Sequence, residues 1–352
     1  MKKVLIVAYA FPPIGGVGVL RVVKFVKYLP AFGWEPVILT VDQGADFVYD
    51  ESLRDDLPAA TQVHRARSWE PFSVTRAKRT ADRLSTSSQN GARGRVKQLL
   101  KSLYFTLRVP DDKLGWLPFA TKLGKQVMQQ QAIDLIFATA PPYTNLLVGR
   151  ALKKASGKPL VADYRDEWTG MRYRDTPSNF FNRFANGRLE RSVLKLTDGI
   201  ITAAQPIADN LRKSGLLTAQ TLQTTIMNGF DPDDYVGYKS DAKNAKFTIV
   251  YTGSFYGERQ TPKYFLQALA QLFQEQPALR AHFQVYFVGS IYASHTRFID
   301  ELSLGDVVQV CGVLPHQQAV QYQVTADALL LVVGKGAGSD VVLTGKIFEY
   351  LG

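Results

Sequence analysis

Short apolar runs alternate along the chain with longer segments whose apolar residues recur at helical spacing. The first run is residues 4–8, a helical pattern follows from Val19 to Leu29, and a second run covers 36–41. A compact apolar run predicts a strand that is buried on both faces, and a 3.6-residue period predicts an amphipathic helix. Strand, glycine-rich loop, helix and strand are the start of a doubly wound parallel sheet.

The alternation continues, with one interruption, to the end of the chain. Further strands are predicted at 133–139, 158–162, 198–202, 224–227, 247–253, 283–289, 307–310 and 328–333. Further helices are predicted at 118–131, 145–156, 180–196, 262–274, 294–302 and 315–325, with a last one that opens at Gly345. A turn-rich stretch at 228–232 divides this series in two. We therefore expect two α/β domains, residues 1–230 and 231–352.

The interruption is a basic segment, residues 65–113, which we interpret as an insertion in the first domain. It holds twelve Lys or Arg and four acidic residues, a net charge of +8 out of +11 for the whole chain. Such a concentration indicates an anionic partner: a phospholipid surface, a lipid phosphate or nucleic acid. No nucleic-acid module or aromatic platform accompanies the charge, so nucleic acid is the least favoured of the three.

The end of the basic segment, Arg95 to Leu107, places apolar residues on one helical face and basic residues around it. A helix of this kind suits an anionic membrane, and it equally suits packing on its own domain with a solvated basic rim. Both interpretations remain open at this point.

Composition narrows the class of protein. The chain is 46% hydrophobic and 21% charged, and no apolar run approaches the length of a membrane span. Two lysines and an apolar core begin the sequence as in a signal peptide, but Pro12 and Pro13 follow directly and no cleavage site is evident. The single cysteine, Cys311, excludes an intrachain disulfide and a zinc-binding cysteine cluster. We expect a cytoplasmic protein.

Polar residues gather after the predicted strand 158–162, where Asp163, Arg165, Asp166 and Glu167 follow one another closely. In an open α/β sheet, ligands bind at the carboxyl ends of the strands. Three carboxylates flanking an arginine can act as a base, a hydroxyl anchor or a phosphate clamp. A surface ion-pair cluster is the alternative interpretation.

The last nineteen residues hold a second candidate site. A loop with three glycines leads from a predicted strand to a helix that Thr344 can cap. Free backbone N–H groups and the positive dipole end converge at such a helix start and attract anions. Lys346 would add a positive charge and Glu349 an acceptor for a hydroxyl, which suits a sugar nucleotide. Many strand–helix turns in α/β proteins have the same form.

The glycine loop after the first strand does not match the dinucleotide fingerprint G-x-G-x-x-G, because Arg21 stands where the third glycine belongs. The order and spacing of six motifs instead resembles glycosyltransferase family 4, retaining enzymes of the GT-B fold, over nearly the whole chain. The motifs are Pro12-Pro13-Ile14-Gly15-Gly16, Ala140-Pro141-Pro142, Asp163-Tyr164-Arg165-Asp166-Glu167-Trp168, Asn228-Gly229-Phe230-Asp231, Tyr251-Thr252-Gly253-Ser254 and Lys346-Ile347-Phe348-Glu349-Tyr350-Leu351-Gly352.

This resemblance implies two Rossmann-like doubly wound domains facing across a cleft. The C-terminal domain would hold a UDP- or GDP-linked sugar, and the N-terminal domain a glycan or lipid-linked acceptor. The implied reaction is hexosyl transfer with retention of configuration, in polysaccharide biosynthesis for the cell envelope. It needs no metal and no cofactor, because basic side chains and a helix N-terminus stabilise the leaving diphosphate. A place on the inner face of the cytoplasmic membrane would agree with the basic segment.

The resemblance also implies roles for single residues. Glu349 resembles the carboxylate that hydrogen-bonds the nucleotide ribose, and Gly15 and Gly16 resemble the loop that approaches the donor phosphate or the acceptor. Val313 lies in the segment that resembles the backbone binding site for the base. Asp163, Arg165 and Asp166 stand where the family places acceptor-side polar groups, and we expect them to be catalytic.

Two features depart from the family pattern. The arginine and lysine that neutralise the diphosphate would fall on Ser254 and Gln260, so Arg259 and Lys346 are expected to replace them on the donor side. The first of the family's two glutamates would fall on Val341.

The sequence stops at Gly352, inside the predicted last helix, and we interpret it as truncated. These losses leave two alternatives open. One is a catalytically degenerate protein that binds a nucleotide-sugar or a polyanion, and the other is a GT-B sugar-nucleotide epimerase.

Overall fold

The computed structural model describes residues 1–42, 49–70, 109–169, 180–238, 244–255, 260–334 and 345–352. They form two compact units, Met1–Met227 and Asn228–Gly352, so the division falls slightly before the expected boundary at residue 230. Arg259, Val341, Thr344 and the expected helix 95–107 lie outside the described residues. Within the described ranges, no helix is both long and apolar enough to cross a membrane.

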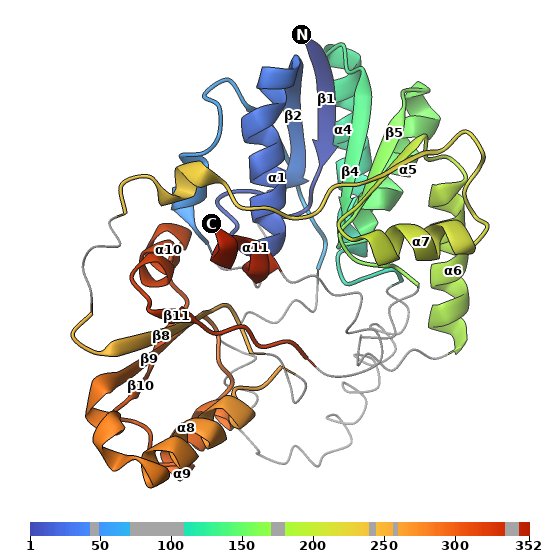
Figure 1. The fold of residues 1–352 in the computed structure, drawn as a ribbon. Helices are drawn as coiled ribbons and strands as arrows, with labels where there is room; N and C mark the ends of the chain where they lie inside the picture. Colours follow the sequence, from blue (N-terminus) through green and yellow to red (C-terminus); the bar gives the residue numbers. More distant parts are fainter. Residues whose placement is uncertain (43–48, 71–108, 170–179, 239–243, 256–259, 335–344) are drawn as a thin grey trace, which may run out of the picture. The chain divides into compact units, whose positions relative to one another are not determined.

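The first unit contains a seven-stranded parallel sheet (Figure 1). Its strands are β1 Lys2–Val7, β2 Trp34–Val41, β3 Gln62–Ala66, β4 Leu135–Ala140, β5 Leu160–Tyr164, β6 Gly199–Thr202 and β7 Leu222–Thr225. They lie in the order β3-β2-β1-β4-β5-β6-β7, and every neighbouring pair is parallel. The order reverses between β1 and β4, so their carboxyl ends flank the topological switch point of a doubly wound sheet. The predicted α/β class is confirmed.

Helices cover both faces of this sheet. They are α1 Val17–Tyr28, α4 Leu117–Gln130, α5 Thr144–Ser156, α6 Phe180–Leu194 and α7 Gln205–Lys213. Val4 and Ile6 of β1 pack in one cluster with Val22 of α1, whereas Gly124 of α4 and Gly149 of α5 lie against the opposite face. Burial on both faces is the reason that β1 and β2 are almost continuously apolar.

The strand β3 was not predicted, because Gln62–Ala66 was assigned in part to the basic insertion 65–113. It is an edge strand that pairs only with β2, and its side chains are mostly half-buried or exposed. An edge strand needs no apolar run, so its sequence gives a weak signal. Arg65, which we expected in the basic insertion, therefore belongs to a strand of the sheet.

The second unit holds a four-stranded parallel sheet in the order β10-β9-β8-β11. The strands are β8 Phe247–Thr252, β9 Phe283–Val288, β10 Val308–Gly312 and β11 Ala328–Leu329, and the α-helices are α8 Lys263–Glu275, α9 Ala293–Glu301, α10 His316–Val324 and α11 Gly345–Leu351. Stacked Tyr251 and Phe255, with ring centroids 4.1 Å apart, form the centre of its core together with Phe287. The predicted strand 328–333 is shorter than expected, since only Ala328 and Leu329 pair with β8 in register.

A buried ion pair connects α1 with the end of β5. Arg21 Nη2 lies 2.9 Å from Asp163 Oδ1, Arg21 Nε donates to Asp163 Oδ2 at 3.2 Å, and Thr139 Oγ1 donates to the same oxygen at 2.7 Å. The Arg21 and Asp163 side chains are only 7% and 0% exposed. Arg21 also donates to the carbonyl oxygens of Ile226, at 2.8 Å, and Met227, at 3.2 Å. One guanidinium therefore joins α1, β5 and the last residues of the first unit.

Glu190 of α6 is a second buried carboxyl group, only 3% exposed. Thr169 Oγ1 donates to its Oε2. Burial raises its pKa from the usual 4.5 to about 7, and the nearby Glu167 adds to the rise. The neutral form is therefore the one that the fold favours.

We predict that Asp163→Asn destabilises the first unit strongly, because it leaves the Arg21 guanidinium buried without its counter-charge. Removing one partner of a buried pair costs about 3–5 kcal/mol. Urea unfolding should give a much lower midpoint for Asp163→Asn. The control is Glu51→Gln, which breaks the exposed Arg54–Glu51 pair and should cost less than about 1 kcal/mol. Equal losses in the two variants would contradict the assignment.

Glu190 predicts a pH dependence of stability. Between pH 4.5 and pH 7 the folded chain keeps a proton that the unfolded chain has released, so stability falls as the pH rises through this window. The fall amounts to roughly 3 kcal/mol at its full extent. Glu190→Gln should abolish it, and the variant should be more stable than the parent at pH 8 and similar at pH 4.5. Parallel curves of unfolding free energy against pH for the two proteins would show that Glu190 does not titrate in this way.

Candidate functional site

Two arginines hold the glycine loop between β1 and α1. Arg65 of β3 donates from Nη2 to the carbonyl oxygen of Pro12 at 2.6 Å and from Nη1 to that of Val41 at 3.3 Å. Arg165, which follows β5, donates from Nη1 to the carbonyl oxygen of Gly18 at 2.6 Å. One side chain comes from β3 and the other from the segment after β5, so the glycine loop and the start of α1 are fixed by distant parts of the chain.

The glycine loop ends at Gly16, the N-cap of α1, with φ +120°. This backbone conformation favours glycine. Gly16 has no side chain with which to cap α1, the first turn holds no acid, and the Val19 N–H bonds to the Gly16 carbonyl oxygen at 2.8 Å, so the positive dipole end of α1 favours negative charge here. At Gly18, a Cβ would overlap the Arg165 guanidinium, so a larger residue would force that side chain to shift.

Arg165 spans the switch point between β1 and β4. Its Nε donates to the carbonyl oxygen of Ala140 at 3.3 Å, and its Nη2 donates to that of Pro141. Burial lowers the pKa of Arg165, and Asp163 and Asp166 partly oppose this effect. With Nε, Nη1 and Nη2 all donating to backbone carbonyls, the guanidinium fixes the glycine loop relative to the loop after β4.

Several other residues of the Asp163–Trp168 segment contact side chains from other parts of the first unit. Asp163 is fully buried against Arg21, and the carbonyl oxygen of Glu167 accepts from Tyr143 Oη at 2.5 Å. Trp168 stacks on Tyr143 with ring centroids 5.0 Å apart. Asp166 is half-buried at the same edge of the sheet. The structure therefore brings Asp163 and Arg165 to the start of α1, which follows the Gly15–Gly16 loop, and Asp166 is the carboxylate of the predicted catalytic set that is in part exposed.

A second buried charge pair lies beyond the end of β1. Lys113 Nζ is 3.0 Å from Glu70 Oε2, and these side chains are 10% and 8% exposed. Tyr9 Oη donates to Glu70 Oε1, and burial raises the pKa of Tyr9 above its usual value. Lys113 and Arg65 were counted in the basic segment, but both serve the interior of the first unit.

In the second unit, Lys346 and Glu349 lie one turn apart on α11, next to the end of β8. The Lys346 Nζ is 4.9 Å from the centre of the Tyr251 ring, and a Cβ on Gly253 would overlap the Lys346 side chain. Burial lowers the pKa of Lys346, while Glu349 acts in the opposite direction. The two charges of α11 therefore stand beside a strand end that carries no side chain.

Neutral side chains anchor α11. The Tyr350 hydroxyl accepts from the backbone N–H of Thr252 at 3.0 Å, and Tyr235 Oη donates to the carbonyl oxygen of Glu349 at 2.7 Å. Gln323 of α10 donates from Nε2 to Thr252 Oγ1 at 2.9 Å and to Glu349 Oε2 at 3.3 Å. Its Oε1 is buried and has no hydrogen-bond partner in the part of the chain that the structure describes.

The other predicted donor-side residues lie along the same sheet edge. Ser254 is half-buried, and its carbonyl oxygen accepts from Tyr251 Oη at 3.1 Å. Gln260 donates to the carbonyl oxygen of Val332 at 3.2 Å. Val313 follows β10, two strands from β8, and is 45% exposed. Arg259, expected to help Lys346, lies outside the described residues.

Glycine also marks the end of β9. A Cβ on Gly289 would overlap the carbonyl of Gly253, and these glycines have φ +143° and φ +122°. The ends of β8 and β9 therefore approach each other as bare backbone.

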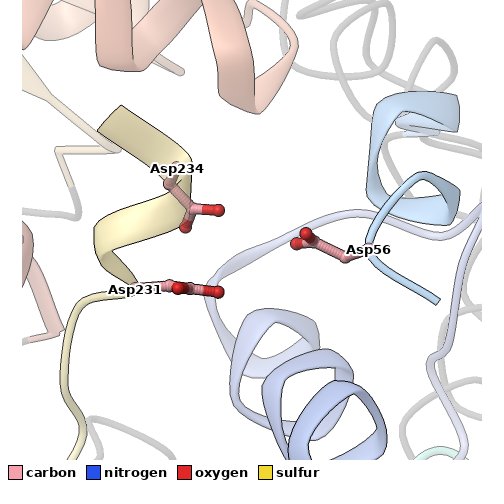
Figure 2. A group of neighbouring side chains, drawn as sticks. All are labelled: Asp56, Asp231 and Asp234. Carbon is pink, nitrogen blue, oxygen red and sulfur yellow. The ribbon is translucent and has the colours of Figure 1, made fainter. Parts of the chain in front are cut away.

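The three aspartates labelled in Figure 2 were considered as metal ligands, and each has a place within its own unit. Asp231 begins the short 3₁₀ helix Pro232–Tyr235, where its Oδ1 accepts from the backbone N–H of Asp233 at 3.1 Å; Asp234 lies on that helix. Asp56 belongs to the first unit and pairs with Lys24 at 2.6 Å and Lys27 at 3.6 Å. We assign no metal to these carboxylates.

Sequence reasoning missed Arg21, Arg65 and Gln323. Arg21 stands in an apolar helical pattern one turn after the glycine loop. A charged residue in that pattern could have indicated a buried ion pair. Arg65 lies in a strand with no apolar run. Gln323 carried no signal, because a glutamine in a helix is ordinarily exposed.

Comparison with known proteins gives a family and a fold. The family model for Glycosyltransferase Family 4 matches residues 14–234. No curated protein sequence matches the chain.

Solved structures give the likeness in fold. Sucrose-phosphate synthase from Thermosynechococcus elongatus has a TM-score of 0.57 at 15% identity, over 94% of this chain and 75% of that one. Anabaena Alr3699/HepE, in complex with UDP and glucose, has a TM-score of 0.56 at 16% identity, over 94% of this chain and 73% of that one. A variant of S. aureus TarM, in complex with Fondaparinux, alpha-GlcNAc-glycerol and UDP, has a TM-score of 0.57 at 8% identity, over 95% of this chain and 81% of that one.

These neighbours are glycosyltransferases with the GT-B fold, and at such identities the likeness concerns the fold. The family match covers well over half of the sequence. The chain belongs to glycosyltransferase family 4.

Proposed function

We propose that the protein transfers a sugar, as a hexosyl group, from a nucleotide-sugar to a glycan or lipid-linked acceptor, with retention of configuration and without a metal ion. The observation that carries this proposal is the pairing of Lys346 and Glu349 on α11 beside the bare end of β8. Family membership supports the reaction class.

The donor would bind to the second unit. Glu349 would accept hydrogen bonds from the ribose hydroxyls, since a carboxylate makes strong, charge-assisted bonds with such donors. Lys346 would bind the diphosphate next to Gly253, where no side chain prevents its approach. A partly desolvated ammonium stabilises the charge that develops on the leaving diphosphate more than a hydrated one does. The backbone around Val313 would contact the base.

The acceptor would bind to the first unit. The Gly15–Gly16 loop and the start of α1 provide backbone N–H groups, and Asp166 would hold the acceptor hydroxyl. Asp163 and Arg165 would position the site rather than touch the acceptor. Asp163 is paired with Arg21, and Arg165 donates to backbone carbonyl oxygens. The acceptor oxygen would bond to the anomeric carbon on the face that the diphosphate leaves, and its proton would pass to the departing phosphate oxygen. Catalysis of this kind depends on placement and charge stabilisation.

UDP is the first nucleotide to test, because the similar HepE and TarM structures both contain it. A lipid-linked acceptor would place the enzyme at the inner face of the cytoplasmic membrane, in synthesis of a cell-envelope polysaccharide.

A second candidate function is nucleotide-sugar binding without transfer. Ser254 and Gln260 favour it, because they stand where the family has its diphosphate-binding cations and Gln260 is already bonded to Val332. Release of UDP from a bound UDP-sugar, measured with and without an acceptor, distinguishes the two functions.

We predict that Glu349→Ala weakens nucleotide binding by roughly 10- to 100-fold, which corresponds to the loss of hydrogen bonds to a charged group. Thermal-shift titrations with UDP, GDP and ADP in EDTA measure it. In the parent protein, a nucleotide at 100 times its dissociation constant should stabilise the fold by roughly 2.7 kcal/mol. Glu301→Ala removes an exposed carboxylate of the same unit, paired with Arg297, and should leave affinity unchanged. Unchanged affinity in Glu349→Ala would refute the donor site.

We predict that Asp166→Asn lowers turnover roughly 100-fold while donor affinity is retained, because the variant loses the charged anchor of the acceptor hydroxyl. UDP release in the presence of a bacterial membrane-lipid extract measures turnover. The control is Asp209→Asn, an exposed carboxylate of the first unit that pairs with Arg212. A parallel loss of donor affinity, or unchanged turnover, would exclude the role given to Asp166.

A further inference from the structure

Three phenylalanines are exposed together at the start of α6. Phe180, Phe181 and Phe184 are 84%, 51% and 55% exposed. The rings of Phe180 and Phe184 stack on each other with centroids 6.3 Å apart, in contact with solvent rather than with the core. Single exposed apolar residues are common on proteins, whereas a contiguous aromatic group marks an interaction surface.

Basic residues continue the same face of α6. Arg188 and Arg191 follow Phe180 and Phe184 at intervals of three or four residues and form one stripe along the helix, which Lys195 extends directly after the last residue of α6, where its N–H bonds to the Arg191 carbonyl oxygen at 3.1 Å. All three are exposed, and the Arg188 guanidinium lies 5.6 Å from the centre of the Phe184 ring.

The stripe, flanked by the exposed Arg183, carries positive charge alone. The acidic residue of α6 is Glu190, which is buried and accepts from Thr169 Oγ1. Among the described residues, no carboxylate forms an ion pair with Arg183, Arg188, Arg191 or Lys195. We call this set of three phenylalanines and four basic residues the α6 face.

The opposite side of the helix explains why the α6 face is free to bind elsewhere. Val193 and Leu194 are fully buried, and Asn186 Oδ1 accepts from Trp168 Nε1 at 2.7 Å. At the border of the α6 face, Arg150 of α5 donates to Ser192 Oγ. These contacts hold α6 on the first unit without any help from the exposed phenylalanines.

We propose that the α6 face docks the first unit on an anionic lipid bilayer. The phenyl rings have no polar group to keep them in water and would enter the boundary between headgroups and acyl chains. The four basic side chains would bind the lipid phosphates, which attract juxtamembrane Lys and Arg. This surface is separate in sequence from the basic segment, residues 65–113, and the inference deepens the proposed function, on which it rests for the lipid-linked acceptor.

The test is flotation of the whole protein with vesicles of phosphatidylcholine alone or mixed with phosphatidylglycerol. We expect binding to the mixed vesicles only, weakening as sodium chloride is raised, because salt screens exposed charges. Replacing the three phenylalanines together (Phe180→Ser, Phe181→Ser, Phe184→Ser), or three arginines together (Arg183→Gln, Arg188→Gln, Arg191→Gln), should weaken binding at least tenfold.

Matched controls alter exposed residues of the same kinds elsewhere on the first unit. Phe32→Ser removes a phenylalanine that is 78% exposed, and Lys154→Gln with Lys158→Gln removes two exposed charges. Both should bind vesicles like the parent. The thermal unfolding midpoint of each variant verifies folding, and all of the substituted side chains are exposed.

Three outcomes would overturn the proposal. The parent fails to bind anionic vesicles, the α6 variants bind them as the parent does, or the α6 substitutions change self-association in sedimentation velocity while vesicle binding persists. The nucleotide thermal shift is measured on the same samples. Its absence in the parent would refute the donor site and leave the vesicle result standing, whereas a normal shift with no vesicle binding would refute the docking surface alone.

Discussion

The arrangement of the first unit depends on a buried ion pair between Arg21 and Asp163. Arg21 and Asp163 are both buried, and a buried ion pair is stable only while its partners and their other hydrogen bonds stay in place. Because the same guanidinium holds the carbonyls of Ile226 and Met227, the first helix, the fifth strand and the exit of the chain cannot move separately. Arg65 and Arg165 extend this arrangement to the glycine loop. Arginine suits the task because its planar fork keeps several donors in a fixed geometry.

The second unit uses a different construction around its candidate site. Tyrosine, glutamine and threonine side chains hold α11, and Glu349 takes part in this network by accepting from Gln323. Burial lowers the pKa of Lys346, whose side chain lies against the bare backbone of Gly253. The first unit is thus fixed around its glycine loop by arginines, whereas neutral side chains position the charged helix α11 of the second.

The fold was readable from the sequence wherever a strand is buried on both faces. The apolar runs at 4–8 and 247–253 coincide closely with β1 and β8. Edge positions gave the errors: β3 has no apolar run, and β11 stops after two residues although its run continues. The site was harder to predict, because the environment of Asp163 is set by Arg21, which is 142 residues away in the chain. A local pattern can find a carboxylate at a strand end, but it cannot find the buried partner that determines what the carboxylate does.

The paired glycines at the ends of β8 and β9 have a consequence for how this enzyme can diversify. A side chain at Gly253 would require a strained φ of +122° and a shift of Lys346, and one at Gly289 would meet the neighbouring backbone, so substitution is costly at both positions. Substitution along this edge is therefore less constrained at an exposed position such as Val313 than at the two glycines, where the backbone conformation itself would have to change.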